Sequence, residues 1–226
     1  MKPKWMMAGV VWLTWLFFMA PTLSAVRAAD AGLALEEILD RVEKRYSGDG
    51  FTADFMQEST IKAMKITDFA RGRVFVKYPG QMRWEYQEPE PQIIITDGIK
   101  LWIYRPEDNQ VMTGNAPVFF RDGKGASFLS DVKIIREKFN IAMDTTSEEL
   151  FYRFTLFPRE KTLDITEIQM AVDKKDYTIT RIVTVNQYDD VTHIELINHR
   201  FDVNLDDSLF SFKVPEGVDE LKIDEQ

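Results

Sequence analysis

The sequence predicts a mainly β protein whose strands form one antiparallel sheet or barrel. Short runs of alternating apolar and polar residues recur along the chain, and turn-forming residues separate them. Helical periodicity is confined to two stretches. Several strands are apolar on both faces, so the sheet must pack on a helix and also curl onto itself or meet a second sheet. A curled sheet with few helices leaves an internal apolar space.

The strand pattern is clearest between Gly72 and Thr113. Five short strands are predicted there, at residues 72–77, 81–87, 92–96, 99–104 and 109–113. Asp97 and Gly98 lie between two of these apolar runs. This pair predicts a β-hairpin with a type I′ turn, which needs a positive φ at both central residues.

Large side chains gather on these strands. Alternation places Met82, Trp84 and Tyr86 on one face of their strand, and Arg83 and Glu85 on the other. In the next hairpin Trp102 and Tyr104 share a face. These rings are interpreted either as the core of the sheet or as the lining of an apolar cavity for a hydrophobic ligand.

The helical stretches lie on either side of this region. Residues 31–46 predict an amphipathic helix that packs on the sheet, since Leu35, Ile38, Leu39 and Val42 recur at helical spacing. Residues 127–139 predict a short helix after a segment that contains proline and glycine. This second helix either caps the open end of the sheet or forms a movable lid over a cavity.

The rest of the chain predicts more strands in the same single domain, residues 29–226. Residues 61–69 are expected to form a loop or hairpin, and the acidic tail from Glu216 a loose end. The remaining strands are expected at residues 51–59, 140–145, 150–157, 164–172, 177–186, 191–200 and 210–214.

Composition excludes several functions. The chain has 226 residues, no cysteine and a formal net charge of −9. Nucleic acid and steady attachment to an anionic membrane both call for basic patches, so neither is predicted as a partner. Without cysteine there is no disulfide framework and no site for a lipid anchor, so stability must come from the core.

The first 28 residues predict a secretory signal peptide. Lys2 and Lys4 precede an uncharged apolar run, a proline ends it, and small residues then offer cleavage after Ala25 or Ala28. The run is long for a signal peptide and slightly short for a membrane-spanning helix, so an uncleaved anchor is the alternative. The segment has a bacterial appearance, which predicts export to the periplasm.

The groups that catalysis or metal binding would need are missing or badly spaced. There is no cysteine nucleophile, no G-x-S-x-G turn and no phosphate-binding loop. His193 and His199 lie six residues apart on a predicted strand and should point to the same side with Glu195, but zinc needs three or four ligands. The histidines are interpreted as surface residues, and the sequence predicts neither an enzyme nor a cofactor.

Four motifs carry a family likeness. They are F-x-A-x-F-x-Q from Phe51, G-x-V-x-V-K-x-P-G-x-x-R-W-E-Y from Gly72, D-G-x-x-L-W-x-Y from Asp97 and L-F-x-F-x-x-P-x-G-V from Leu209. Together, and in this order, they resemble the periplasmic outer-membrane lipoprotein carriers, the LolA family. The resemblance spans nearly all of the chain after the signal segment.

The resemblance implies a curved, incompletely closed antiparallel β-barrel with an α-helical lid over an apolar cavity. It also implies a periplasmic chaperone that takes acylated lipoproteins from an inner-membrane ABC-type release complex and passes them to an outer-membrane lipoprotein receptor. Because that receptor is itself a lipoprotein, the missing cysteine favours the carrier. The oligomeric state is left open by the sequence, and a monomer is the simplest form for a carrier that must hand over its cargo.

Alternation and resemblance together suggest the site. The expected cavity wall consists of Val76, Met82, Trp84, Ile95, Trp102 and Tyr104, and the residues expected under the lid are Leu39, Phe128 and Leu129. Well-studied members hold the lid with an arginine just before the proline of the K-x-P motif, where this chain has Tyr78. Either the Tyr78 hydroxyl bonds the lid, or Arg83 replaces that arginine, or the lid is held differently.

Three other functions remain open at this level. One is a carrier for another lipid, such as a glycolipid moved with an exporter. Another is the lipid-sensing domain of an envelope-stress regulator, although such regulators have a second domain after it. The third is a hydrolase acting on lipid. Lipid that stays unchanged after incubation with the purified protein would exclude this function.

Overall fold

The computed structural model of the chain describes residues 35–144, 150–161 and 163–223. The expected signal segment, residues 1–28, and the connection between the strands expected at residues 140–145 and 150–157 lie outside these ranges. Within the described residues, no helix combines the length and the apolar character that crossing a bilayer requires.

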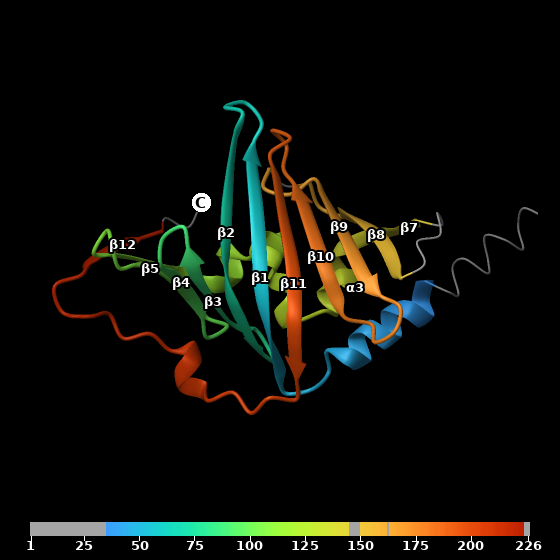
Figure 1. The fold of residues 1–226 in the computed structure, drawn as a ribbon, viewed down its shortest axis with the longest axis horizontal. Coiled ribbons are helices and arrows are strands. Elements are labelled where there is room, and N and C mark those ends of the chain that lie inside the picture. Colours follow the sequence, from blue (N-terminus) through green and yellow to red (C-terminus); the bar gives the residue numbers. More distant parts are fainter. Residues whose placement is uncertain (1–34, 145–149, 162, 224–226) are drawn as a thin grey trace, which may run out of the picture.

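The strands form one curved, twelve-stranded sheet that is not closed into a barrel, because β12 and β7 stay at its two edges (Figure 1). The order is β12-β6-β5-β4-β3-β2-β1-β11-β10-β9-β8-β7, and only the pairing of β12 with β6 is parallel. This confirms the mainly β fold. The strands are β1 Gly50–Ile61, β2 Ile66–Lys77, β3 Gln81–Glu88, β4 Gln92–Thr96, β5 Lys100–Arg105, β6 Gln110–Asn115, β7 Phe139–Asp144, β8 Phe151–Pro158, β9 Glu167–Asp173, β10 Ile179–Val185, β11 Val191–Phe201 and β12 Asp219–Lys222.

The helices are short and lie outside the sheet. Residues 35–45 form the N-terminal helix, in agreement with the predicted amphipathic helix over its described part. The single helix predicted at residues 127–139 is wrong in detail, because a 3₁₀ segment and a separate short helix share that stretch. The short helices are α2 Ala116–Phe119, η1 Arg121–Ser130, α3 Ile134–Lys138 and η2 Asp207–Phe210.

The centre of the sheet depends on a close backbone approach at Gly72. A Cβ atom placed on this residue would stand 1.9 Å from the carbonyl oxygen of Glu85 on β3 and 2.9 Å from the ring of Phe55 on β1. Glycine alone lets β1, β2 and β3 meet here while the Phe55 ring turns inward. Phe55 then packs edge-on against Trp84, with ring centroids 4.9 Å apart.

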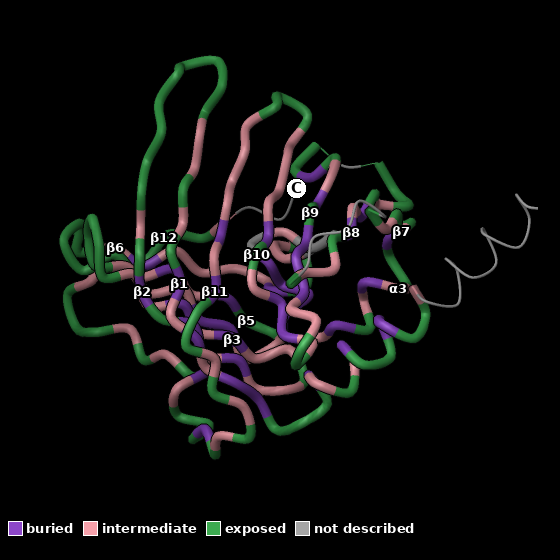
Figure 2. The backbone as a smooth tube through the Cα atoms, turned by 45° about the vertical axis from the view of Figure 1, so that its right-hand side comes forward, coloured by how far each residue is buried: buried purple, intermediate pink, exposed green. Residues whose placement is uncertain are grey.

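The main core lies between the concave face of the sheet and the helical segments. Figure 2 shows the buried residues concentrated there, while the tip of the β1–β2 hairpin is exposed. Alternate residues of several strands supply this core, as period-two alternation requires, whereas Leu101 and Ile103 of β5 belong to a second, smaller cluster. Phe55, Val76 and Trp84 come from the sheet, and Leu39 and Phe128 from the helical segments.

The hairpin at Asp97 and Gly98 forms as predicted, but its turn is not type I′. Gly98 has a φ of 93°, whereas Asp97 has no positive φ. The Asp97 side chain instead accepts hydrogen bonds from the backbone N–H groups of Ile99, at 2.8 Å, and Lys100, at 2.7 Å. These hydrogen bonds to the Asp97 side chain stabilise a connection that is longer than a two-residue type I′ turn.

The C-terminal prediction is wrong in two places. The expected strand at residues 210–214 is absent, since Phe210 ends η2 and the next residues have no regular structure. The expected loose tail instead contains β12, whose backbone pairs with β6 from Asp219↔Gln110 to Lys222↔Thr113. Any extended segment can pair with a free edge on β6. The local sequence pattern of the tail therefore did not reveal this pairing.

The two histidines do not share a side. Between Thr52↔Arg200 and Asp54↔Ile197 the register of β1 and β11 shifts, which inserts a bulge around Asn198. After the bulge the half-buried His199 faces inward and stacks on the buried Phe51, with ring centroids 6.1 Å apart. The prediction from even spacing is wrong because a bulge reverses the alternation.

Candidate functional site

Residues 116–138, here called the lid segment, cover the concave face of the sheet. They comprise α2, η1 and α3, which lie behind the strands in Figure 1. Asn115 begins the segment, because its side chain accepts a hydrogen bond from the N–H of Val118 at 3.1 Å and Pro117 occupies the first turn. Within it, the Ser127 hydroxyl donates to the carbonyl of Phe120 at 2.9 Å and the Ser130 hydroxyl to that of Ser127 at 2.8 Å.

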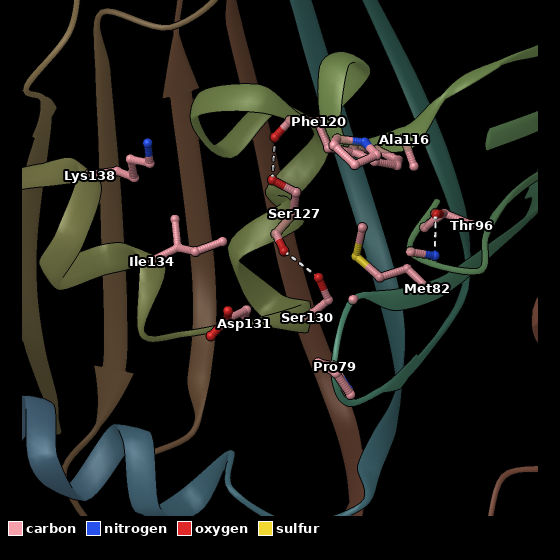
Figure 3. A pocket seen from close by; sticks show the side chains of 13 residues that line it. Pro79, Met82, Thr96, Ala116, Phe120, Ser127, Ser130, Asp131, Ile134 and Lys138 are labelled. Carbon is pink, nitrogen blue, oxygen red and sulfur yellow. Dashed lines mark hydrogen bonds between the residues drawn. The ribbon is translucent and has the colours of Figure 1, made fainter. Parts of the chain in front are cut away.

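A cavity of about 510 Å³ lies between the lid segment and the ends of β3 and β4 (Figure 3). This volume falls in the usual range for small-ligand pockets. Met82 enters it from the sheet, and Phe120 and Ile134 from the lid segment, so that most of its wall is apolar. Asp131 and Lys138 also line the cavity and bring one negative and one positive charge to its wall.

Three of the six residues expected in the cavity wall lie on the inner face. Met82 lines the cavity, whereas Val76 and Trp84 lie in the core beside it. All three are almost fully buried. The Trp84 indole Nε1 is buried without a hydrogen-bond partner.

The other three are on the opposite face, and the expectation that they share the wall is wrong. Ile95 pairs with Arg83 on one side and with Trp102 on the other, so it faces away from Met82. Tyr104 lies on the same outer face as Trp102, and its ring contacts Phe212, with centroids 5.2 Å apart. The C-terminal segment crosses this face, where Phe212 contacts Tyr104 and the Leu209 carbonyl accepts a hydrogen bond from Arg83, and Ile95 on the same face is fully buried. Strand β4 is apolar on both faces, so its alternation could not be read from the sequence.

The three residues expected under the lid segment are all buried in the main core. Phe128 and Leu129 come from η1 and have no exposed surface, and Leu39 comes from the N-terminal helix. One backbone hydrogen bond, from the N–H of Gly80 to the carbonyl of Ser130 at 3.2 Å, ties the segment to the β2–β3 turn.

Among the side chains that the structure describes, neither proposed substitute for the family's arginine bonds the lid segment. The Tyr78 hydroxyl is buried without a hydrogen-bond partner. Burial, together with the negative charge of the nearby Asp131 carboxylate, raises the pKa of Tyr78, so this hydroxyl stays neutral. Arg83 lies on the outer face, where it donates to Glu85 Oε1 at 2.6 Å and to the Leu209 carbonyl at 3.2 Å.

The lid segment is held by Arg136 instead, a residue that sequence reasoning missed. This arginine of α3 donates to Glu43 Oε1 at 2.5 Å and also to the carboxylates of Glu36 and Asp40 on the N-terminal helix. We call these three contacts the Arg136 clasp. Burial disfavours the charged form of Arg136, but the three carboxylates outweigh it and raise the pKa of the guanidinium.

A signal for the clasp exists in the sequence. Glu36, Asp40 and Glu43 recur at i, i+4 and i+7, which places three carboxylates on one side of a helix. Such a stripe usually faces solvent, and nothing near it in the sequence identifies its partner. Arg136 lies 93 residues beyond Glu43.

The fold and the site define a binding protein for an apolar ligand. An open, curved sheet carries a segment that covers a largely apolar cavity. Within the residues that the structure describes, no group of three or more metal-ligating side chains is gathered. The groups near the cavity are hydroxyls, one carboxylate and one ammonium, and they do not form a nucleophile with a base.

Comparison with known proteins identifies the family. Residues 47–213 match the family model described as "Outer membrane lipoprotein carrier protein LolA". An outer-membrane lipoprotein carrier protein of Coxiella burnetii is 30% identical over 210 residues, which are 92% of this chain and 93% of that protein. One from Alkalilimnicola ehrlichii is 26% identical over 221 residues, or 97% of this chain and 95% of that protein. The chain therefore belongs to the family of outer-membrane lipoprotein carriers, which are periplasmic and not enzymes.

A solved structure supports the fold. An uncharacterized conserved protein from Thermus thermophilus superposes with a TM-score of 0.56 at 14% sequence identity. The superposition covers 84% of this chain and 99% of that protein. At this identity the likeness concerns the fold alone, and it agrees with the open sheet described above.

Proposed function

We propose that the cavity between the lid segment and the sheet receives the acyl chains of lipoproteins released from the inner membrane, which the protein then carries to the outer membrane. The observation that carries this proposal is a largely apolar cavity of about 510 Å³ under a segment that is held in part by polar contacts of Ser130 and Arg136. Membership of the lipoprotein carrier family supports it.

The physical need for such a container is large. Each CH₂ group of an acyl chain that leaves water contributes about 0.8 kcal/mol, so a long chain in the aqueous periplasm needs a dry site. The lid segment can open by separating Phe128 and Leu129 from the core and by breaking the Arg136 clasp. Opening enlarges the site, and closure returns the apolar side chains to the core when the cargo has left.

The proposal includes partners and a location. The carrier acts as a monomer in the periplasm, to which the signal segment of residues 1–28 directs it. It takes acylated lipoproteins from an inner-membrane ABC-type release complex and hands them to an outer-membrane lipoprotein receptor. Residues 29–226 supply the single carrier domain.

A release assay tests the proposal. Spheroplasts that synthesise a lipoprotein are given the purified mature protein, and soluble lipoprotein is measured in the supernatant. Ile134→Glu places a charge on the wall of the cavity, and Ile99→Glu is the matched control because Ile99 is 70% exposed outside the core. We expect release by the wild type and by Ile99→Glu, and little release by Ile134→Glu.

Thermal unfolding of each variant shows whether the fold is intact. No release by folded wild type contradicts the lipoprotein cargo, and equal release by folded Ile134→Glu contradicts the placement of the acyl chains. Mass spectrometry of lipid that copurifies with the protein then distinguishes a carrier of another lipid, because a glycolipid and a lipoprotein differ in mass.

A further inference from the structure

The far part of β2 has a strand neighbour on one side only. β1 pairs with β2 along its whole length, from Gly50↔Lys77 to Ile61↔Ile66. β3 pairs with β2 only from Lys77↔Gln81 to Arg71↔Glu88. Within the described residues, 66–70 therefore form an unpaired strand edge, called here the β2 edge, and it extends past β3 in Figures 1 and 2.

The sequence of the β3–β4 connection explains why this edge has no second neighbouring strand. The register of β2 and β3 shifts between Arg71 and Gly72, and the chain leaves the sheet after Glu88. Pro89 and Pro91 follow, and a proline has no N–H group with which to continue a ladder. β4 begins at Gln92 on the other side of β3, so within the described part of the chain no strand returns to cover the β2 edge.

Asp68 is the one charged side chain among residues 66–70, so the β2 edge has little of the usual protection against pairing. Natural edges carry prolines, lysines or bulges, or are covered by another element. Residues 66–70 read Ile-Thr-Asp-Phe-Ala, and their register with β1 has no shift. Ile66 is 41% exposed and Phe69 is 65% exposed. By contrast, β12 carries three charged side chains among its four residues.

The edge is also ordered before any partner binds, because side-chain contacts fix the tip of its hairpin. At the tip of the β1–β2 hairpin the Lys62 ammonium pairs with Asp189 at 2.6 Å, and the Lys62 N–H donates to Asp190 Oδ1 at 2.9 Å. These contacts join the tip to the β10–β11 hairpin. A pre-ordered edge costs less conformational entropy on binding than a flexible one.

We infer that the β2 edge binds an extended peptide segment of a partner protein, which adds to the sheet as a strand. A strand edge presents alternating N–H and C=O groups that another extended backbone satisfies. The pairs Glu58↔Phe69 and Met56↔Arg71 make Met56 and Phe69 diagonal neighbours on the outer face, and both are exposed. They form a contact for one apolar side chain of the peptide.

The short edge favours a peptide over a second copy of the chain. A stable dimer buries roughly 1,200 Å² or more, which a five-residue strand pairing does not reach by itself. A single added strand in peptide recognition needs only such a length, and its backbone hydrogen bonds supply the affinity. The partner segment is therefore free of proline, extended, and apolar at the position that faces Phe69.

The probe is a capped peptide of alternating threonine and valine, about six residues long. Amide hydrogen exchange of the full mature protein is followed by NMR with and without the peptide. At a peptide concentration of about ten times Kd, the amides of residues 66–70 whose N–H groups point away from β1 should exchange about tenfold more slowly. The same peptide with N-methylated amides cannot donate and should leave their exchange unchanged.

Variants connect the effect to the edge. Phe69→Lys should weaken peptide binding, and Ile99→Lys is the control because Ile99 is equally exposed in the β4–β5 loop. Thermal unfolding checks that both are folded, and Thr67→Lys replaces Phe69→Lys if that variant is not.

The inference is overturned if exchange at residues 66–70 does not slow, if it slows equally at β7 and β12, or if the N-methylated peptide acts as well as the other. It is also overturned if protection appears without peptide as the protein concentration rises and sedimentation shows a doubled mass, because the edge then pairs with a second copy.

Discussion

Removing the Arg136 clasp should release the lid segment without unfolding the sheet. In Arg136→Met the side chain keeps its apolar stem but loses the guanidinium that contacts Glu36, Asp40 and Glu43. The clasp joins α3 to the N-terminal helix, and it takes no part in the strand ladders. Its loss should therefore favour local opening over global unfolding.

The magnitude follows from the exposure of the four side chains. Glu36 and Asp40 are 61% and 72% exposed, so each of their pairs with Arg136 contributes about 0.2–1 kcal/mol. Arg136 and Glu43 are 28% and 27% exposed, so this pair contributes more than a surface pair but less than the 3–5 kcal/mol of a fully buried one. Because one guanidinium makes all three contacts, their contributions do not add in full, and we expect a total of about 1–2 kcal/mol, which raises the open population roughly 5- to 30-fold.

Amide hydrogen exchange measures this opening residue by residue. Exchange in α3, Ile134–Lys138, should accelerate by the same factor in Arg136→Met, while exchange in the β1–β11 ladder stays as in the wild type. The matched control is Arg41→Met, since Arg41 pairs with Glu37 on the same helix and does not reach the lid segment.

Two results would refute this reasoning. One is unchanged exchange in α3, which would mean that the apolar contacts of Phe128 and Leu129 hold the segment by themselves. The other is equal acceleration in α3 and in the β1–β11 ladder, which would mean that the clasp stabilises the whole fold.

Three other substitutions test the structure by urea unfolding. Gly72→Ala should lower the free energy of unfolding by about 3 kcal/mol, because its Cβ would overlap the Glu85 carbonyl, and unchanged stability would contradict that close approach. Tyr78→Phe should raise the free energy of unfolding by about 1 kcal/mol by removing a buried hydroxyl without a partner, whereas a loss of stability would favour a lid-bonding hydroxyl. Burial lowers the pKa of His199 below its ordinary value of 6.5, so below that value the unfolded state binds more protons than the folded state. The stability that neutral His199 provides is therefore present above pH 6.5 and is lost as the pH falls through the folded pKa. His199→Gln should remove this part of the pH dependence, and an unchanged profile between about pH 7.5 and about pH 5 would contradict it.

Local patterns predicted the strands well. β4 lies at residues 92–96 as expected, and β3, β5 and β6 differ from the prediction by one or two residues at their ends. Alternation and turn residues act over a few positions, so a sequence displays them directly. The same signal placed Met82 and Trp84 on the inner face.

Patterns failed where a residue's surroundings come from distant segments. Ile95 belongs to the outer face because Arg83 and Trp102 pair with it, yet the apolar run of β4 reads the same for either face. His199 points inward because of a bulge in β11 that has no local marker beyond the backbone at Asn198. β12 pairs with β6 although its own residues are mostly charged.

The sequence by itself determined a mainly β protein of the lipoprotein carrier family, because period-two alternation, turn chemistry and family motifs are properties of neighbouring residues. Only the tertiary structure decided which aromatic side chains face the cavity, that Arg136 holds the lid segment in place of Tyr78, and that part of β2 is left unpaired. These features depend on contacts between segments far apart in the chain, and such contacts form only when the sheet has curved and the lid segment has closed on it.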